Sequence, residues 1–305
     1  MMALVALLAT LLMTSCVTSQ REPKTHQGTT ENIQSVFTGR CWDYDVTKYN
    51  NILPRVDAGC NELWDKFFDA FSFSSPCDVQ KANYDSFYAL ADQNLPEDKV
   101  MFWSGVYTLS HRFAEAGHNY VTLEDTIIGY LVNSLVWCGQ LTKPGVNYTA
   151  CPEWSDCPLE ASESFWAGAS ATFAKQAKGK VTLMVDGSNP DKPAYRRSSF
   201  FGKHELPSMS DAVNEVHVLV THTLDKPKIE FCGSGSLVDL EEDVTKRGFS
   251  YECEDDPVAV MHLLCANEPS SRECLMALAH ASGQLADITA LPGRHMNAMP
   301  DQMAG

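Results

Sequence analysis

Four short stretches of the chain are rich in aromatic side chains and carboxylates, which together can bind a flat cationic ligand and stabilise positive charge on it. They are FWSGVY (102–107), TLEDT (122–126), ESFW (163–166) and SSFFGKHELP (198–207). The last contains a His-Glu pair, but a helical zinc motif would need a histidine where Ser208 stands, and Pro207 would break the helix. Glu205 therefore needs an explanation other than zinc chemistry.

Each stretch also has a purely structural explanation. Trp103 and Trp166 belong to a residue type found more often in cores than on ligand surfaces. Glu124 would be stabilised at a helix start by the dipole alone, and Glu205 could be a solvated turn residue. Three histidines are interpreted as surface residues rather than metal ligands: His111, His118 and His204. The spacing alone indicates an α/β protein with an aromatic pocket.

The elements that position these stretches fall into two groups. Helical periodicity predicts helices over 61–73 and 162–176, and a third that Thr122 caps with Asp125 and that ends before Gly139. The second half is rich in β-branched residues, and strands are predicted over 99–103, 180–188, 214–222 and 249–253. Helices predicted over 236–246 and 257–266 separate or follow them, which favours a parallel sheet with helical crossovers.

The stretch CGSGSLVDL (232–240) begins like a dinucleotide-binding fingerprint, but Val238 stands where the third glycine is required. We interpret it as a turn that leads into a helix. Ordinary Rossmann-type binding is therefore excluded.

Composition narrows the class of protein. The 305 residues are 44% hydrophobic and carry a formal net charge of −16, which argues against a nucleic-acid partner but permits a small phosphorylated ligand. The apolar run over 3–13 is too short to span a bilayer and predicts a signal peptide of about residues 1–19. The tail over 280–305 contains no hydrophobic block, so we expect it to be flexible and without a membrane anchor.

Apart from Cys16 at the end of the predicted signal peptide, the chain has ten cysteines, an even number that indicates disulfides in a secreted protein. Spacing alone leaves their pairing open, and the absence of a C-x-x-C pair argues against a zinc ribbon or a thioredoxin-type site. Asn147 begins a sequon and is a predicted glycosylation site. We expect a soluble protein that is secreted or held in the lumen of a secretory granule.

Longer stretches carry a resemblance to a known family. The set resembles ADP-ribosyl cyclases, the soluble molluscan members more than the membrane-anchored vertebrate ones, over about residues 37–274. The matching stretches, in order, are KVMFWSGVY, YVTLEDT, NSLVWCGQ, ESFW, MVDGSNP and SFFGKHELP. The resemblance implies an enzyme that converts NAD to cyclic ADP-ribose and nicotinamide, with NAD as substrate and with no metal or other cofactor. It further implies base exchange on NADP with nicotinic acid at acidic pH, and a homodimer.

The resemblance also implies residue roles. Glu205 would stabilise or capture the oxocarbenium-like ribose left when nicotinamide departs. Trp103 and Trp166 would line the pocket for the pyridinium and the purine, and Glu124 would orient the nicotinamide end. Four residues would lie near the diphosphate and ribose or support the pocket: Ser104, Ser170, Phe200 and Phe201.

Phe200 replaces a small threonine of the vertebrate members, and Gly105 replaces an arginine. A bulky ring would exclude water, so we expect cyclisation to dominate over hydrolysis. The alternatives are an NAD glycohydrolase that makes mainly ADP-ribose and a binding protein that has lost catalysis. The second is disfavoured because Glu205 and both tryptophans are present.

The implied fold is a mixed α/β protein stapled by disulfides. It has a helical domain (37–96 and 122–168) and a domain with a four-stranded parallel sheet flanked by helices (97–121 and 169–275), with the substrate cleft between them. The implied disulfides are Cys41–Cys60, Cys77–Cys157, Cys138–Cys151, Cys232–Cys253 and Cys265–Cys274.

Overall fold

The structure, a computed structural model, describes residues 27–44, 53, 58–118 and 120–281. The predicted signal peptide, and the predicted tail from residue 282 onward, lie outside the described residues. Within these ranges no helix is both long enough and apolar enough to cross a membrane.

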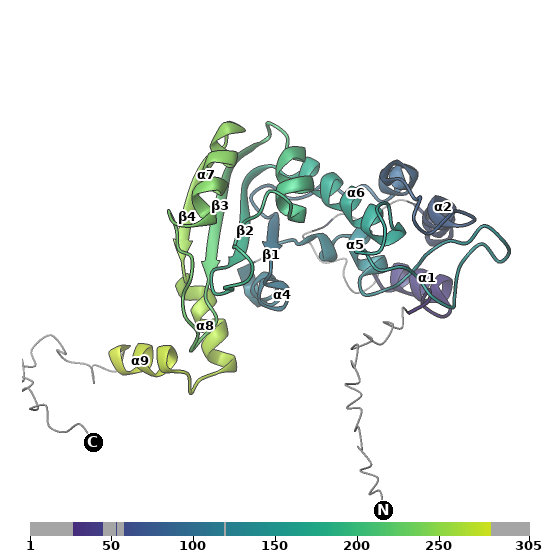
Figure 1. The fold of residues 1–305 in the computed structure, drawn as a ribbon. Helices are drawn as coiled ribbons and strands as arrows, with labels where there is room; N and C mark the ends of the chain where they lie inside the picture. Colours follow the sequence, from purple (N-terminus) through teal and green to yellow (C-terminus); the bar gives the residue numbers. More distant parts are fainter. Residues whose placement is uncertain (1–26, 45–52, 54–57, 119, 282–305) are drawn as a thin grey trace, which may run out of the picture.

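A four-stranded sheet forms one half of the molecule, and all of its strands are parallel (Figure 1). Its strands follow the order of the chain: β1 (Met101–Ser104), β2 (Gly179–Asp186), β3 (Val213–Thr221) and β4 (Ser250–Asp255). The register places Phe102 beside Leu183, and Leu183 beside Val218. The predicted mixed α/β class with a four-stranded parallel sheet is confirmed.

Helices cover both faces of this sheet, as a parallel sheet requires. Met101, Met184 and Leu219 pack on one face with residues of α4 (Tyr107–Phe113) and α8 (Val258–Asn267). Their strand neighbours alternate to the opposite face and join the main core. That core includes the apolar side of α7 (Ser236–Lys246), which begins where the sequence predicts, after the turn at 232–235.

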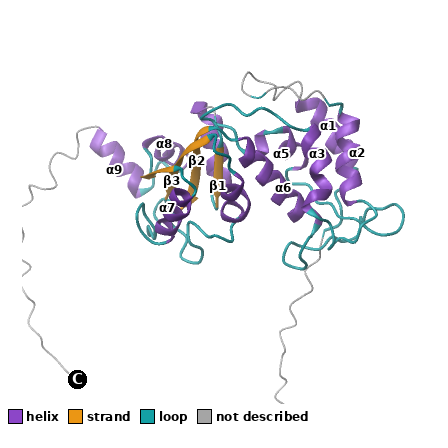
Figure 2. Ribbon diagram, turned by 90° about the horizontal axis from the view of Figure 1, so that it is seen from above, coloured by secondary structure: helices purple, strands orange, loops and turns teal. Residues whose placement is uncertain are grey.

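The other half is helical and lies beside the sheet in both views (Figures 1 and 2). Phe67 lies at its centre, with its ring within 5.1 Å of Phe37, 5.2 Å of Trp137 and 5.8 Å of Phe165, measured between centroids. The helices of this half are α1 (Ile33–Asp43), α2 (Cys60–Phe71), α3 (Asp85–Leu90), α5 (Ile127–Val132) and α6 (Ala161–Gln176), with a 3₁₀ turn η2 (Lys81–Tyr84) before α3.

One hydrophobic core runs through both halves, and α6 leads directly into β2. The predicted boundary at 168/169 falls inside α6. The division into two domains stays a prediction.

The prediction of one continuous helix between Thr122 and Gly139 is wrong. The segment forms a 3₁₀ turn, η4 (Leu123–Asp125), and then α5, which ends at Val132. Thr126 separates the two elements because its backbone is extended and it caps the start of α5. Its hydroxyl donates to the Leu123 carbonyl at 2.6 Å and accepts from the Gly129 N–H at 3.4 Å. Such local hydrogen bonds compete with a continuous helix.

Five disulfides join the pairs that the resemblance implies, so that prediction is confirmed. Cys77–Cys157 joins distant segments of the helical half. Cys265–Cys274 ties α8 to α9 (Arg272–Ala281), which extends away from the sheet (Figure 1).

Candidate active site

The residues with predicted roles lie on elements that pack against one another. β1 carries Trp103 and Ser104, and η4 carries Glu124. α6 carries Trp166 and Ser170, which share a helix face because they are four residues apart. The remaining element is a π-helical turn, η5 (Phe201–Glu205), which contacts both α6 and β1, while α6 also contacts η4. The structure therefore brings the four stretches together.

Glu205 ends η5 and is buried, with 8% of its surface exposed. It is therefore not the solvated turn residue of the structural explanation. Burial raises its pKa to about 8, against a hydrogen bond from Ser170 that lowers it, and the negative charge of Glu124 raises it further. At pH 7 about one tenth of such a group is ionised. The site therefore holds a carboxyl that a nearby positive charge would ionise.

Glu124 lies in different surroundings from Glu205. The indole N–H of Trp103 donates to Glu124 Oε2 at 3.4 Å, and His111 Nε2 lies 3.3 Å from the same oxygen. His111 Nδ1 lies 2.7 Å from the Tyr107 carbonyl oxygen. Both ring nitrogens of His111 thus face acceptors, an arrangement that the doubly protonated imidazolium satisfies. The protein supplies Glu124 with two donors, one of which can be cationic.

His111 was interpreted as a surface residue rather than a metal ligand, and in the structure its side chain is half-buried, with 17% of its surface exposed. Burial lowers the pKa of His111, but the hydrogen bond and negative charge of Glu124, with the Tyr107 carbonyl, raise the net pKa above its usual value. Its ring centroid lies 4.1 Å from that of Tyr107 and 6.1 Å from that of Trp103. A four-residue spacing after FWSGVY places Tyr107 and His111 on one face of α4, a signal that could have identified both residues.

Phe200 and Phe201 have different environments although they are adjacent. Phe201 is part of the core, with its ring centroid 5.7 Å from that of Phe102. Phe200 is half-buried, and its ring contacts those of Trp154 at 5.3 Å and His204 at 5.2 Å. Sequence reasoning missed Trp154.

Ser104 ends β1 and is half-buried at the carboxyl edge of the sheet, where parallel α/β folds bind ligands. Gly105 follows with a φ of 78°, a conformation that favours glycine and turns the chain into α4. Trp103 and Trp166 are also half-buried, and Trp166 packs against the margin of the main core. Among the described residues no group of three or more His, Cys, Asp or Glu side chains could hold a metal ion.

Comparison with known proteins gives a consistent result. A family model for ADP-ribosyl cyclase matches residues 30–274. The ADP-ribosyl cyclase/cyclic ADP-ribose hydrolase of Aplysia kurodai is 53% identical over 248 residues, which are 81% of this chain and 88% of that protein. A crystal structure of Aplysia cyclase with substrate NGD and product cGDPR matches with a TM-score of 0.78 and 52% identity, over 81% of this chain and 98% of that one.

A more distant structure, porcine CD38 with a covalent intermediate, matches with a TM-score of 0.70 and 28% identity, over 76% of this chain and 98% of that one. The matched region spans both halves of the fold and every residue of the site. The chain therefore belongs to the ADP-ribosyl cyclase family and is an enzyme of the ADP-ribosyl cyclase/cyclic ADP-ribose hydrolase type.

Proposed function

We propose that this enzyme cleaves the bond between nicotinamide and ribose in NAD and closes the remainder to cyclic ADP-ribose, with Glu205 facing the reacting ribose. The observation that carries the proposal is the burial of Glu205 on a turn that packs against the elements bearing Trp103 and Trp166. The complex of Aplysia cyclase with NGD and cGDPR supports a nucleotide substrate and a cyclic product.

The reaction follows from the surroundings of Glu205. The nicotinamide of NAD is a cationic pyridinium, which favours the ionised form of a nearby carboxyl whose pKa burial has raised. When the C1′–N bond breaks, its electron pair stays on nicotinamide, which leaves neutral, and positive charge develops at C1′. A carboxylate in a dry site stabilises that charge or forms an ester with C1′. The covalent intermediate of porcine CD38 supports the ester.

The second step decides the product. If the adenine N1 attacks C1′, the ring closes and Glu205 leaves as a carboxylate; if water attacks, linear ADP-ribose results. We propose that Phe200 favours the first outcome by excluding water beside the turn that ends at Glu205. Glu124, held by Trp103 and His111, would accept the carboxamide N–H of nicotinamide and orient it.

The same intermediate permits base exchange. A free pyridine base such as nicotinic acid can attack C1′ in place of adenine or water, so that NADP and nicotinic acid become substrates. The carboxylate of nicotinic acid would be repelled by Glu124, and a cationic His111 would reduce that repulsion at acidic pH. No cofactor enters this scheme, because NAD itself supplies the leaving group.

We further propose that the protein is secreted or stored in a granule lumen as a homodimer. Five disulfides support an oxidising compartment. Glycosylation at Asn147 is supported by the exposure of Tyr148 and Thr149, which follow it in the loop that Cys138–Cys151 closes.

The test is to incubate the oxidised protein with NAD and to separate the products by chromatography, with Glu205→Gln as the comparison. Mostly cyclic ADP-ribose, absent with the variant, is the expected result. Mostly linear ADP-ribose would instead make the enzyme an NAD glycohydrolase. No nicotinamide release would contradict the proposal and leave a binding protein on this scaffold.

A further inference from the structure

A short loop beside the site is fixed at both of its ends. Residues 152–156 lie between Cys151, which pairs with Cys138, and Cys157, which pairs with Cys77. Within the loop, the Glu153 N–H donates to an oxygen of Asp156 at 2.8 Å. The loop therefore presents its central residue, Trp154, from a constrained backbone.

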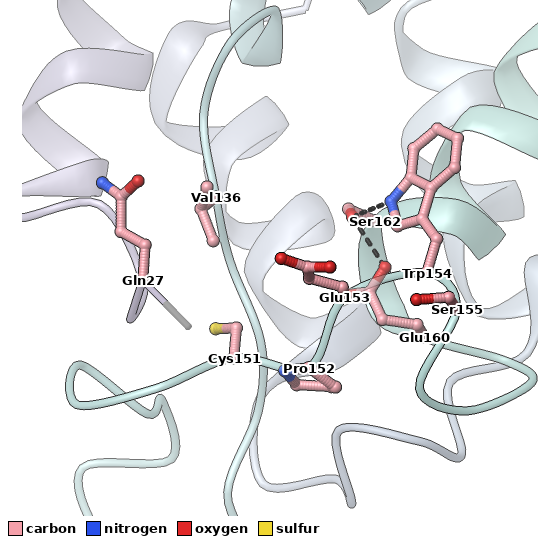
Figure 3. A pocket seen from close by; sticks show the side chains of 9 residues that line it. All are labelled: Gln27, Val136, Cys151, Pro152, Glu153, Trp154, Ser155, Glu160 and Ser162. Carbon is pink, nitrogen blue, oxygen red and sulfur yellow. Dashed lines mark hydrogen bonds between the residues drawn. The ribbon is translucent and has the colours of Figure 1, made fainter. Parts of the chain in front are cut away.

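The indole of Trp154 is held by a hydrogen bond rather than by burial. It is 46% exposed, and its Nε1–H donates to Ser162 Oγ at 2.8 Å. Ser162 in turn donates to Glu160 Oε2 at 2.7 Å, as Figure 3 shows. Glu160 is 1% exposed and caps α6 by accepting the Glu163 N–H at 2.8 Å. The indole is thus connected to the first turn of α6, the helix that carries Trp166 and Ser170.

A cavity of about 540 Å³ adjoins the indole (Figure 3). It is lined by Trp154, by Ser162 and Glu160, and by Gln27, Val136, Cys151, Pro152, Glu153 and Ser155. Empty space next to a half-exposed ring leaves the ring room to move if its hydrogen bond is lost. The hydrogen bonds from Trp154 to Ser162 and from Ser162 to Glu160 therefore keep the indole in contact with a neighbouring aromatic ring.

That neighbour is Phe200. The two ring centroids are 5.3 Å apart and the ring planes are inclined by 32°. Phe200 also contacts His204, and burial with the positive charges of Lys203 and Lys81 lowers the pKa of His204 to about 4. The second ring against Phe200 is therefore neutral at physiological pH, and a neutral ring does not change its contact with Phe200 when the pH varies above about 5.

We propose that Trp154 is a positioning residue that sets the partition between cyclisation and hydrolysis by fixing the ring of Phe200. The inference rests on the proposed function, in which Phe200 excludes water from the intermediate. Trp154 acts through Phe200, and Ser162 and Glu160 act through Trp154. Nicotinamide release, which depends on Glu205, does not require this arrangement.

The test compares variants that remove successive parts of the chain. Ser162→Ala keeps the indole and removes its acceptor, Trp154→Phe keeps a ring and removes the donor, and Trp154→Ala removes both. The matched control is Trp42→Phe, because Trp42 is an exposed tryptophan on α1 outside the site. Each protein receives NAD, and the ratio of cyclic to linear ADP-ribose is measured together with the rate of nicotinamide release.

We expect the ratio to fall about threefold with Ser162→Ala and Trp154→Phe and about tenfold with Trp154→Ala, a tenfold change corresponding to about 1.4 kcal/mol. The rate of nicotinamide release should change less than twofold. In a Phe200→Ala background the Trp154 substitutions should have no further effect on the ratio, as expected when one residue acts through the other.

An unchanged ratio of cyclic to linear ADP-ribose in the Ser162 and Trp154 variants would overturn the inference. So would a fall in this ratio that is as large in the Phe200→Ala background as in the unmodified enzyme. Thermal unfolding of each variant separates a partition effect from a folding defect, and Ser162→Ala, a change of one oxygen atom, guards against misfolding of Trp154→Ala. If the unmodified enzyme forms no cyclic product, the proposed cyclase activity itself fails. If it forms cyclic product in the same ratio as every variant, the positioning role alone fails.

Discussion

The two acidic residues of the site lie in opposite surroundings. Glu124 receives the indole N–H of Trp103 and faces the imidazole of His111. Glu205 receives a hydrogen bond from the neutral hydroxyl of Ser170, and burial raises its pKa to about 8. The protein's own side chains therefore stabilise the negative charge of Glu124. The negative charge of Glu205 is stabilised chiefly when a cationic ligand binds in the site.

The difference indicates which carboxylate is suited to orienting the ligand and which to stabilising positive charge on it. A carboxylate with its own cationic partner is a fixed acceptor, suited to orienting a ligand. A carboxyl that is costly to ionise in the empty site gains most when a cation arrives, so its charge appears when the substrate does. Such a group lowers the stability of the folded protein in return for catalysis.

The largest expected effect separates these roles. Glu205→Gln should reduce nicotinamide release about 1,000-fold or more, because it removes the charge that, in the proposed function, faces C1′. It should also stabilise the protein in alkali. The folded pKa of Glu205, about 8, lies above the usual value of 4.5. The favourable contribution of the protonated carboxyl is therefore present below pH 4.5 and is lost as the pH rises to 8, a cost on the order of 4 kcal/mol.

Thermal unfolding of both proteins at pH 4, 6 and 9 measures this cost. The variant should melt at a similar temperature at pH 4 and at a clearly higher one at pH 9. A constant difference in melting temperature between the two proteins at the three pH values would show that the cost of burying Glu205 does not depend on its charge. Glu62→Gln, an exposed acid on α2, serves as the control.

The second effect is the pH dependence of the unmodified enzyme. If the free enzyme must ionise Glu205, kcat/KM for NAD should rise about tenfold per pH unit between pH 5 and 7 and level off near pH 8. kcat should level off at a lower pH, since bound pyridinium favours the ionised form. Steady-state kinetics across this range provide the measurement. Parallel profiles for kcat and kcat/KM would contradict ionisation by the substrate.

The sequence predicts the sheet well and the site in part. Alternating valines define β3, and the predicted range of 214–222 differs from the observed strand by one residue at each end. The helix from Thr122 to Gly139 was wrong because a threonine hydroxyl at position 126, rather than the hydrophobic stripe, decides where α5 begins. Periodicity does not report such local hydrogen bonds.

The residues missed in the site share a physical reason. His111 pairs with Glu124, and Trp154 contacts Phe200, each across segments separated in sequence and joined only by folding. Taken singly, a histidine or a tryptophan has many explanations. The four-residue spacing of Tyr107 and His111 places them on one helix face, but no comparable spacing singles out Trp154. The resemblance implied roles for Glu205, Trp103 and Trp166, but not for His111 and Trp154, which contact residues of the candidate site.

A smaller effect tests the fixed charge of Glu124. His111→Gln keeps a hydrogen-bond donor at this position and removes the positive charge. That charge faces Glu124, Asp125 and the Tyr107 carbonyl. Exchange of nicotinic acid at pH 5 should fall about tenfold, roughly 1.4 kcal/mol. At pH 8, where the imidazole itself is less charged, the fall should be about twofold. Base-exchange assays at both values measure this, and an equal fall at both would contradict a role for the charge.

The smallest effect tests the hydrogen bond from Ser170, which favours the ionised form of Glu205. Ser170 is buried on α6, and its hydroxyl lowers a pKa that burial and Glu124 raise. Ser170→Ala should raise the pKa of Glu205 further, so that kcat/KM falls about threefold to fivefold at pH 7 and is nearly restored at pH 9, as expected for the loss of about 1 kcal/mol. Ser164→Ala, the same change at another buried serine of α6, is the matched control. If both variants lose activity equally at every pH, the effect belongs to the packing of α6, and Glu205 owes its ionisation to the substrate alone.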